Sequence, residues 1–446
     1  MDSSDGRGRV SPFVRSLRAV FGEPWLAFNR VLTFHLLSRR LRKRATAISY
    51  SPERCSMLYV AASSLPYHTS GYTTRTHEVL CALRAMGRHV QILTRPGYPW
   101  DRADRLTDAA GLETMVDDVR YSHVRQPSNQ RPVLQFALQA APMVAEVAMR
   151  HRVAVIHAAS NHVSALPGLL AARRLGIPFH YEMRGLWELT RISRMPEYEG
   201  SQSYRQGLDL EGLVARHADR LFVISEQLGA YVKEKWGVAE GRIALLPNCI
   251  DPERIVPADP QHVQPNSIGY AGSLIGYEGL DTLIDAVDAL VRRGTEVRAS
   301  IVGDGEAQGK LEAQVRRLGL SDRIHFLGKV PPAAAREILG RCALVCIPRK
   351  PFKVCEIVPP IKLVEALAMA KPVVVPDLPV FRDEMGKDPA GWFFKAGDPV
   401  DLARVIESAL ADEKALLAMG ARAREYATTK RRWCDFLADV VQLSAG

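Results

Sequence analysis

Residues 267–305 read SIGYAGSLIGYEGLDTLIDAVDALVRRGTEVRASIVGDG, and this run gives the clearest indication of the fold class. The apolar runs at 267–272 and 297–305 have the length of buried strands. The segment 279–293 between them repeats its apolar residues at helical spacing. Because a strand, a helix and a second strand follow one another, the stretch predicts a βαβ unit with parallel strands.

The same alternation extends along the chain in both directions. We predict further strands at 57–62, 89–95, 119–124, 153–160, 178–184, 220–225, 243–248, 323–329, 343–349, 371–376 and 392–396. Helical segments separate most of them, and helices over about 399–445 complete the chain. Residues 249–266 interrupt the pattern with four prolines, which is typical of a linker.

This pattern predicts an α/β protein with two Rossmann-like, doubly wound parallel-sheet domains. We place the first domain at 55–250, a linker at 251–266 and the second domain at 267–446, whose last helix should return toward the first domain. Ligands of such sheets bind where the carboxyl ends of the strands open into a crevice. We therefore expect the functional site in a cleft between the two domains.

The composition supports this organisation. The chain has 446 residues, of which 47% are hydrophobic and 24% charged, as in a globular protein of two domains. Its seven cysteines form no C-x-x-C pair, which argues against a disulfide scaffold or a zinc cage and favours a reducing cytoplasm. No run of about eighteen apolar residues occurs, so we expect no membrane-spanning helix.

The positive charge is concentrated in an N-terminal arm, residues 1–54. The arm carries eleven Lys and Arg against four Asp and Glu, which accounts for +7 of the total net charge of +10. Large apolar residues precede the basic run RRLRKR at 39–44, the opposite order to an export signal. One hypothesis is a helix that lies on anionic lipid at the inner face of the plasma membrane. The alternative is an arm that packs on the body or stays disordered. Nucleic acid is not expected as a partner, because the body has no basic stripe.

Several residues at strand ends are candidates for ligand binding. Gly71, Gly272, Ser273 and Arg349 should all face the cleft, where glycines permit close backbone approach. Gly303 and Gly305 belong to GDGEAQG, whose third glycine comes one residue too late for a dinucleotide fingerprint. We interpret this segment as a tight turn beside the ligand instead of an NAD or FAD site.

The segment CEIVPPIKLVEALA, residues 355–368, carries the most chemistry. Pro360 suits the first turn of a helix, and Lys362 and Glu365 then share one helical face. Glu356 lies just before this helix. A lysine, two carboxylates and the nearby Arg349 suit a nucleotide sugar, since cations bind the diphosphate and carboxylates bind sugar hydroxyls. The alternative is a surface helix with an ordinary Lys/Glu pair.

Motifs in both halves resemble the GT-B retaining glycosyltransferases of family 4. In the second half the resemblance lies in YAGSLIGYEGLDTLIDAV, IVGDGEAQGKLEAQVRRLGLSDRIHFLGKV, KPVVVPD and GWFFKAGDP; in the first half it lies in SLPYHTSGYTTRTHEVLCAL, YEMRGLWE and LLPNCID. It extends from about residue 56 to the C-terminus. The resemblance implies a UDP- or GDP-sugar donor held by the second domain, an acceptor met by the first, and transfer with retention of configuration.

The resemblance also assigns roles to individual residues. Glu365 matches the glutamate that binds the donor ribose, Glu356 corresponds to the earlier glutamate near the donor sugar, and Gly71 matches the glycine loop near donor and acceptor. Arg184 stands where many members have a histidine near the reacting sugar. Arg184 and Glu356 are therefore the candidate catalytic residues.

Besides Arg184, the sequence departs from the family pattern in two ways. Eight residues separate the two glutamates, where the family commonly has seven. Ser273 and Glu278 stand where many members place an arginine and a lysine on the diphosphate. This loss leaves Arg349 and Lys362 as the compensating cations.

These observations predict a hexosyltransferase that acts on an acceptor hydroxyl in envelope polysaccharide or glycolipid synthesis. We expect no metal cofactor, because the chain has no Asp-x-Asp pattern. Two alternatives stay open. One is a nucleotide-sugar epimerase or hydrolase of the same fold, and the other is an inactive relative that only binds.

Overall fold

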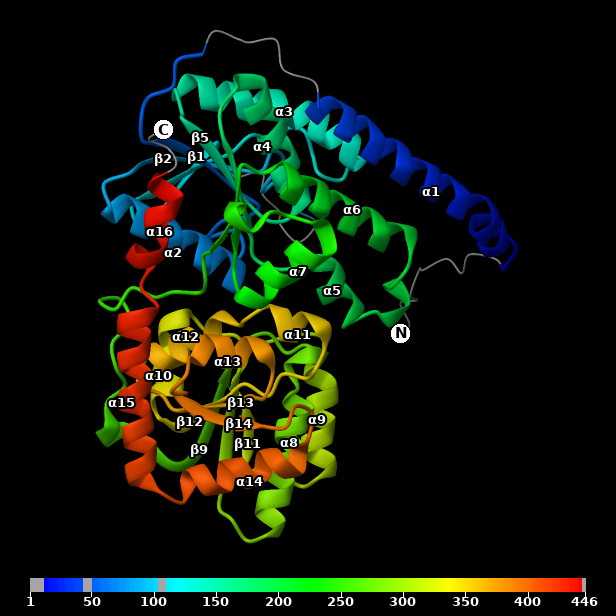
Figure 1. Cartoon of the computed structure of the whole chain (residues 1–446). Helices are drawn as coiled ribbons and strands as arrows, with labels where there is room; N and C mark the ends of the chain where they lie inside the picture. The colour runs from blue at the N-terminus through cyan, green and yellow to red at the C-terminus, as the bar shows by residue number, and fades with distance from the viewer. Residues whose placement is uncertain (1–11, 43–49, 103–109, 443–446) are drawn as a thin grey trace.

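A computed structural model describes residues 12–42, 50–102 and 110–442 of the chain. Two separate sheets organise these residues (Figure 1). The eight strands of the first sheet follow the order β3-β4-β2-β1-β5-β6-β7-β8, and the six of the second follow β11-β10-β9-β12-β13-β14. The strands are β1 Ser56–Ala61, β2 His89–Thr94, β3 Glu113–Val116, β4 Val119–Ser122, β5 Val155–Ala159, β6 Phe179–Met183, β7 Arg220–Val223, β8 Ile243–Leu245, β9 Gln264–Ala271, β10 Arg298–Val302, β11 Ile324–Phe326, β12 Cys342–Cys346, β13 Val373–Pro376 and β14 Gly391–Phe394.

Helices cover both faces of each sheet, so the central strands are buried along their whole length. The helices are α1 Pro12–Arg42, α2 Gly71–Ala85, α3 Val133–Arg150, α4 His162–Leu175, α5 Trp187–Ile192, α6 Gln202–His217, α7 Glu226–Trp236, α8 Leu280–Arg292, α9 Gln308–Arg317, α10 Pro332–Gly340, α11 Lys353–Ile357, α12 Ile361–Ala368, α13 Pro379–Met385, α14 Pro399–Leu410, α15 Glu413–Lys430 and α16 Trp433–Gln442. The prediction of two doubly wound α/β domains is confirmed, and the βαβ unit at 267–305 is formed by β9, α8 and β10.

The strand pairing is parallel throughout, except at one edge of the first sheet. There β3 and β4 form an antiparallel hairpin, and β3 was not predicted. Asp117 and Asp118 turn the chain between them with positive φ angles of 43° and 62°. A two-residue turn of this kind leaves no room for a crossover helix, so the alternating pattern has no signal here.

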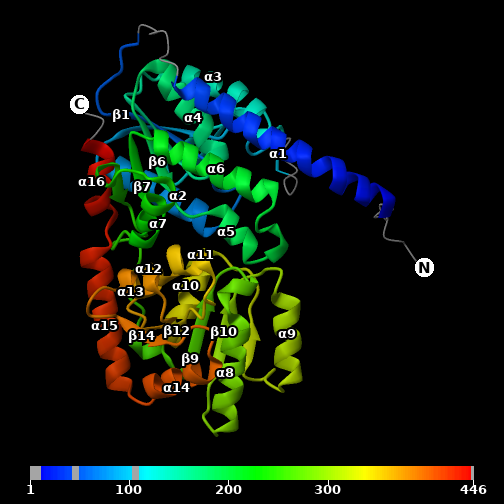
Figure 2. The same cartoon turned by 45° about the vertical axis from the view of Figure 1, so that its right-hand side comes forward.

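The two domains are joined at two places on the same side of the molecule. The backbone N–H of Ile250 donates to the carbonyl of Arg431 at 2.8 Å, beside the kink between α15 and α16. Helix α15 packs on α12 in the second domain, and α16 packs on α2 in the first (Figures 1 and 2). Arg424 ties α15 to the linker through the carbonyls of Pro252 and Ile255.

The N-terminal helix α1 lies across α6 and extends beyond the body at its N-terminal end (Figure 2). Leu37 and Leu41 are buried in the core of the first domain, and the Arg30 guanidinium pairs with Asp209 of α6 at 2.6 Å. The alternative in which the arm packs on the body is therefore confirmed for this part of α1. The last two residues of the basic run, 43 and 44, lie outside the described residues. None of the described helices is both long and apolar enough to cross a membrane.

Candidate active site

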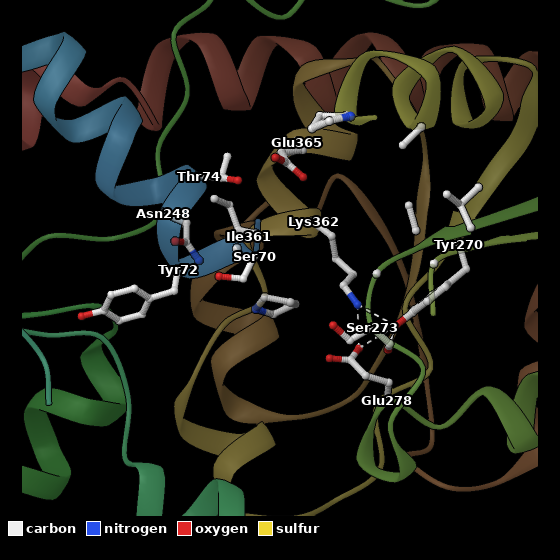
Figure 3. Close-up of a pocket in the computed structure, with 18 of the residues that line it drawn as sticks. Ser70, Tyr72, Thr74, Asn248, Tyr270, Ser273, Glu278, Ile361, Lys362 and Glu365 are labelled. Carbon is white, nitrogen blue, oxygen red and sulfur yellow. Dashed lines mark hydrogen bonds and ion pairs between the residues drawn. The ribbon is translucent and has the colours of Figure 1, made fainter. Parts of the chain in front are cut away.

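A cavity of about 480 Å³ lies between the two domains, where the carboxyl ends of both sheets face each other. The first domain contributes the start of α2 and the segments that follow β6 and β8. The second domain contributes the segments after β9, β10 and β12 and the starts of α10 and α12. Figure 3 shows Ser70, Tyr72 and Asn248 on one side, opposite Lys362 and Glu365 on the other.

Two glycines shape the second-domain wall. Gly272 follows β9 with φ of +154°, and a Cβ there would collide with the Lys362 ammonium. Gly303 follows β10 with φ of +131°, and a Cβ there would collide with the Gly272 carbonyl. Both line the cavity together with Ser273. A side chain at Gly272 or Gly303 would displace these neighbouring atoms and would also be strained at a positive φ, so both positions require glycine.

Gly305, predicted to bind the donor, does not line the cavity. A Cβ at Gly305 would collide with the backbone of Leu274. The carbonyl of Asp304 accepts from the Leu274 N–H at 2.8 Å. This hydrogen bond joins the loop after β10 to the loop after β9. In this structure the glycine therefore serves the packing of the two loops and is not placed where the prediction had it, at the cavity.

The predicted cations Arg349 and Lys362 line the cavity, but a carboxylate lies between them. Glu278 accepts from Arg349 Nη2 at 2.8 Å through Oε1 and from Lys362 Nζ at 2.8 Å through Oε2. Burial would raise the pKa of Glu278, but the two cations outweigh burial and lower the pKa to about 2. The cluster therefore carries a net charge of +1, not the +2 expected from two free cations.

Tyr270 completes this cluster. Its hydroxyl accepts from Lys362 Nζ at 2.8 Å and donates to the Ser273 carbonyl at 3.0 Å, and the ammonium lies 4.3 Å from its ring centroid. The dashed lines of Figure 3 follow these contacts from α12 to the loop after β9. Lys362 is thus held at the cavity wall from two sides.

Glu365 lies on α12 one turn beyond Lys362 and points into the cavity (Figure 3). Burial raises the pKa of its carboxyl, while the charges of Arg336 and Lys362 oppose that shift. Among the residues that the structure describes, no side chain forms a hydrogen bond or an ion pair with this carboxylate. Glu365 is therefore able to accept hydrogen bonds from a ligand.

Glu356, predicted as catalytic, is not brought into the cavity. It lies on the short helix α11, where its carboxylate accepts from Lys353 Nζ at 3.0 Å. The chain then turns through Val358, Pro359 and Pro360, and these three residues line the cavity in its place. The extra residue between the glutamates and the break between α11 and α12 together turn Glu356 away.

Arg184 lines the cavity from the first domain and is held by an extensive network. Its guanidinium pairs with Glu182 at 2.8 Å, donates to Thr76 Oγ1 at 2.6 Å, and lies 4.7 Å from the ring centroid of Tyr72. Arg184 therefore forms a buried ion pair within the first domain and also reaches the cavity. Burial would lower the pKa of Arg184, but Glu182 raises it overall.

Gly71 is the first residue of α2 and also lines the cavity. Ser70 caps the helix, and its backbone N–H donates to Thr73 Oγ1 at 3.0 Å. A Cβ on Gly71 would lie 3.1 Å from Cγ2 of Ile361 in the other domain. Glycine here lets the starts of α2 and α12 approach each other across the cleft.

Three cations at the cavity, Arg75, Lys329 and Arg336, were not among the predicted site residues. Arg75 lies in the first turns of α2, so its nearness to the predicted Gly71 was an available signal. Lys329 lies in the motif that ends RIHFLGKV, to which no binding role was assigned, and Arg336 lies in α10, outside the recognised motifs. In all, six basic side chains (Arg75, Arg184, Lys329, Arg336, Arg349 and Lys362) and three carboxylates (Glu278, Asp304 and Glu365) line the cavity.

The described residues contain no group of three or more His, Cys, Asp or Glu side chains able to hold a metal ion. The six basic side chains at the cavity outnumber its three carboxylates among the described residues. Such a wall suits a ligand with two phosphate groups, because arginine and lysine both bind phosphate oxygens.

Comparisons with known proteins agree with this geometry. The family described as Glycosyl transferases group 1 matches residues 253–426, and the Glycosyl transferase 4-like domain matches residues 70–249. The 2-deoxystreptamine glucosyltransferase of Streptomyces kanamyceticus is 24% identical over 367 residues, which cover 77% of this chain and 91% of that protein.

Solved structures share the whole two-domain arrangement. Sucrose-phosphate synthase from Thermosynechococcus elongatus superposes with a TM-score of 0.71 at 17% identity, covering 87% of this chain and 98% of its own. HepE from Anabaena, in complex with UDP and glucose, has a TM-score of 0.64 at 19% identity and covers the same shares. Fold and site thus define a GT-B glycosyltransferase. The chain belongs to family 4 of these enzymes.

Proposed function

We propose that this glycosyltransferase moves a hexose-type sugar from a UDP- or GDP-sugar to an acceptor hydroxyl. The observation that carries the proposal is the cavity wall on α12, where Lys362 and the unpartnered carboxylate of Glu365 face the same space. The matched glucosyltransferase and the UDP and glucose bound by HepE point to the same class of donor.

In this proposal the second domain binds the donor. Glu365 accepts hydrogen bonds from the ribose hydroxyls, and Lys362 and Arg349 bind the diphosphate. Negative charge grows on the diphosphate as the sugar leaves, so fixed cations stabilise the transition state more than the bound donor. Arg336 and Lys329 add positive charge at the start of α10.

The first domain meets the acceptor and the reacting sugar. Arg184 closes the cavity from this side, where its side chain is fixed by Glu182 and Thr76. We propose that it shapes the reacting centre. Arg184→Lys should then lower turnover about tenfold or more while nucleotide affinity changes little, because a lysine cannot reproduce the planar fork.

We further propose that transfer retains the anomeric configuration and needs no metal ion. Glu278 is engaged by Arg349 and Lys362, so it is poorly suited to act as a nucleophile on the sugar. Attack from the donor's own face, as the family resemblance implies, needs no such group. Excess chelator should leave the initial rate unchanged if side-chain cations balance the diphosphate.

Mass spectrometry of products formed from a panel of UDP- and GDP-sugars tests the reaction. Product should carry one added hexose and should form only with acceptor present. Nucleotide release without acceptor would favour a hydrolase or epimerase, and absence of turnover with retained binding would favour an inactive relative.

We also propose that the enzyme works at the inner face of the plasma membrane, near a lipid-linked acceptor for envelope polysaccharide or glycolipid. The face of α1 opposite α6 leaves Trp25 64% exposed and Phe28 57% exposed. Leu32, Leu36 and the exposed Arg39 continue the same face at helical spacing. An apolar stripe that ends in arginines is complementary to an anionic lipid surface.

Vesicle co-sedimentation tests this location. Substitution of Trp25, Phe28 and Leu32 by alanine should abolish binding to phosphatidylglycerol vesicles, and salt should weaken binding of the unaltered chain. Alanine at Leu112, Met115 and Val256, which are equally exposed elsewhere, is the matched control and should bind normally. Equal binding of both variants would contradict the proposal.

A further inference from the structure

We propose that Glu278 is an internal counter-ion that competes with the donor's diphosphate for Lys362 and Arg349. The inference rests on the proposed function, because it concerns the charge of the ligand in the same cavity. It explains why a carboxylate stands in a wall that otherwise suits an anion. It also predicts how the product nucleotide leaves.

The geometry supports exchange between the carboxylate and a ligand. Glu278, Lys362 and Arg349 all line the cavity, so a diphosphate can approach both cations directly. Lys362 Nζ has three hydrogens, and Glu278 and the Tyr270 hydroxyl accept two of them. Arg349 gives Nε and Nη2 to Glu278 and keeps Nη1 on the Val358 carbonyl at 2.9 Å. Both cations therefore stay anchored when they turn toward a second anion.

The charges determine the direction of the effect. Lys362 and Arg349 carry +2, and Glu278 reduces the cluster to +1 at any pH well above its pKa of about 2. A diphosphate bound beside the cluster is attracted by the two cations and repelled by the carboxylate. Removing the carboxylate charge should therefore strengthen diphosphate binding, although it leaves two buried cations without their partner when no ligand is present.

The same competition affects release. After the sugar has left, the nucleoside diphosphate must give up both cations, and Glu278 is in place to pair with them again. Glu278 thus lowers the free energy needed to separate the nucleoside diphosphate from Lys362 and Arg349. Without it, product should leave more slowly and limit turnover.

Glu278→Gln removes the charge and keeps the shape. We expect UDP and inorganic pyrophosphate to bind about tenfold more tightly to this variant in calorimetry, whereas uridine, which has no phosphate, should bind as before. Its melting temperature without ligand should fall, and the rise on adding UDP should be larger than in the unaltered chain. Affinity and stability would then move in opposite directions, which simple loss of structure cannot produce.

Glu211→Gln is the matched control. Glu211 is buried in the first domain outside the cavity, where it accepts from Tyr181 and His162. Its replacement should lower the melting temperature and leave UDP affinity unchanged. Equal or weaker binding of UDP and pyrophosphate by Glu278→Gln would overturn the inference.

If Glu278→Gln does not fold, a second pair of variants tests whether Glu278 acts as a counter-ion. Lys362→Met leaves the cluster neutral, and Lys362→Met with Glu278→Gln restores +1. The double variant should bind pyrophosphate about tenfold more tightly than Lys362→Met, and equal affinities would refute the counter-ion. If the unaltered chain binds pyrophosphate but neither UDP nor GDP, the proposed donor fails instead, and the two outcomes stay distinct.

Discussion

Each domain contains one buried carboxylate that gathers two cations, and the two networks differ in what surrounds them. In the first domain Glu182 pairs with Arg75 at 2.9 Å and with Arg184 at 2.8 Å. In the second domain Glu278 pairs with Arg349 and Lys362, both at 2.8 Å. Both clusters carry a net charge of +1, so charge alone does not distinguish them.

The difference lies in how completely each carboxylate is enclosed. Glu182 also accepts from the Tyr59 hydroxyl at 2.8 Å and contacts His157 Nε2 at 3.3 Å, and it does not line the cavity. Within the part of the chain that the structure describes, Glu278 has only the Tyr270 hydroxyl, at 3.3 Å, as a further hydrogen-bond partner, and Glu278 does line the cavity. The same pairing therefore acts as structural support where it is sealed, and is open to exchange where it forms the wall.

The largest effect should come from breaking the sealed network. Glu182→Gln leaves two buried arginines without their counter-charge, and loss of one partner of a buried pair costs about 3–5 kcal/mol. Urea denaturation of the variant measures this loss. Glu365→Gln, at a partly buried carboxylate that forms no ion pair with any described residue, should change stability little. A loss below about 1 kcal/mol for Glu182→Gln would contradict the distinction between the two networks.

The network around Glu278 should make the free energy of unfolding depend on pH. The pKa of Glu278 is about 2 in the folded chain and about 4.5 when unfolded. Between these values the unfolded chain binds more protons, so the unfolding free energy falls as pH decreases from about 4.5 toward 2. The full difference corresponds to about 3 kcal/mol. The urea-unfolding profile of Glu278→Gln between pH 5 and 3 should fall less steeply than that of the unaltered chain, and parallel profiles would refute this assignment.

An effect on binding without loss of stability is expected at Glu365. Charged hydrogen bonds contribute about 1.5–3 kcal/mol each, so Glu365→Ala should weaken nucleotide binding by about ten- to a hundredfold. Glu365→Gln should lose less, because its amide oxygen still accepts a hydrogen bond. Calorimetry with UDP and GDP on folded variants makes the comparison. Unchanged nucleotide affinity in Glu365→Ala would contradict the proposal that Glu365 on α12 binds the ribose.

The smallest effect is expected at an exposed ion pair that bridges the domains. Arg194 Nε donates to Glu306 Oε1 at 2.8 Å, and the two side chains are 44% and 49% exposed. Solvent screens such pairs, so Arg194→Ala should change the unfolding free energy by at most about 1 kcal/mol. A double-mutant cycle with Glu306→Ala measures the coupling. A coupling energy above about 2 kcal/mol would contradict the view that exposed ion pairs in this protein are weaker than the buried ones.

Much of the fold was predictable from local pattern. The run at 267–305 and its repeats specify buried strands and amphipathic helices, and these formed as β9, α8, β10 and their counterparts. Strand β4 was predicted, but its hairpin partner β3 was not, because this short edge strand has too few apolar residues to produce a signal. The break between α11 and α12 escaped for a related reason, since Pro359 and Pro360 indicate a helix start but not a separate helix before it.

The site was predictable where one element carries it. Lys362 and Glu365 share a face of α12 because three residues nearly complete a helical turn. Spacing along one helix did not show that Glu356 lies outside the cavity, because its direction depends on the turn at Val358–Pro360. Nor did it show that Gly305 lies outside, because the neighbour of this glycine is the Leu274 backbone, thirty-one positions earlier in the chain.

The alternation of strands and helices along the chain was enough to predict two parallel-sheet domains and a cleft at the carboxyl ends of their strands, and helical spacing was enough to place Lys362 and Glu365 on one face of α12. Which charges meet could not be predicted in this way. Glu278 lies 71 positions from Arg349 and 84 from Lys362, and Glu182 lies 107 from Arg75. Burial makes each of these pairs strong, and burial depends on how separate elements pack, so the charge of the site is a property of the folded chain.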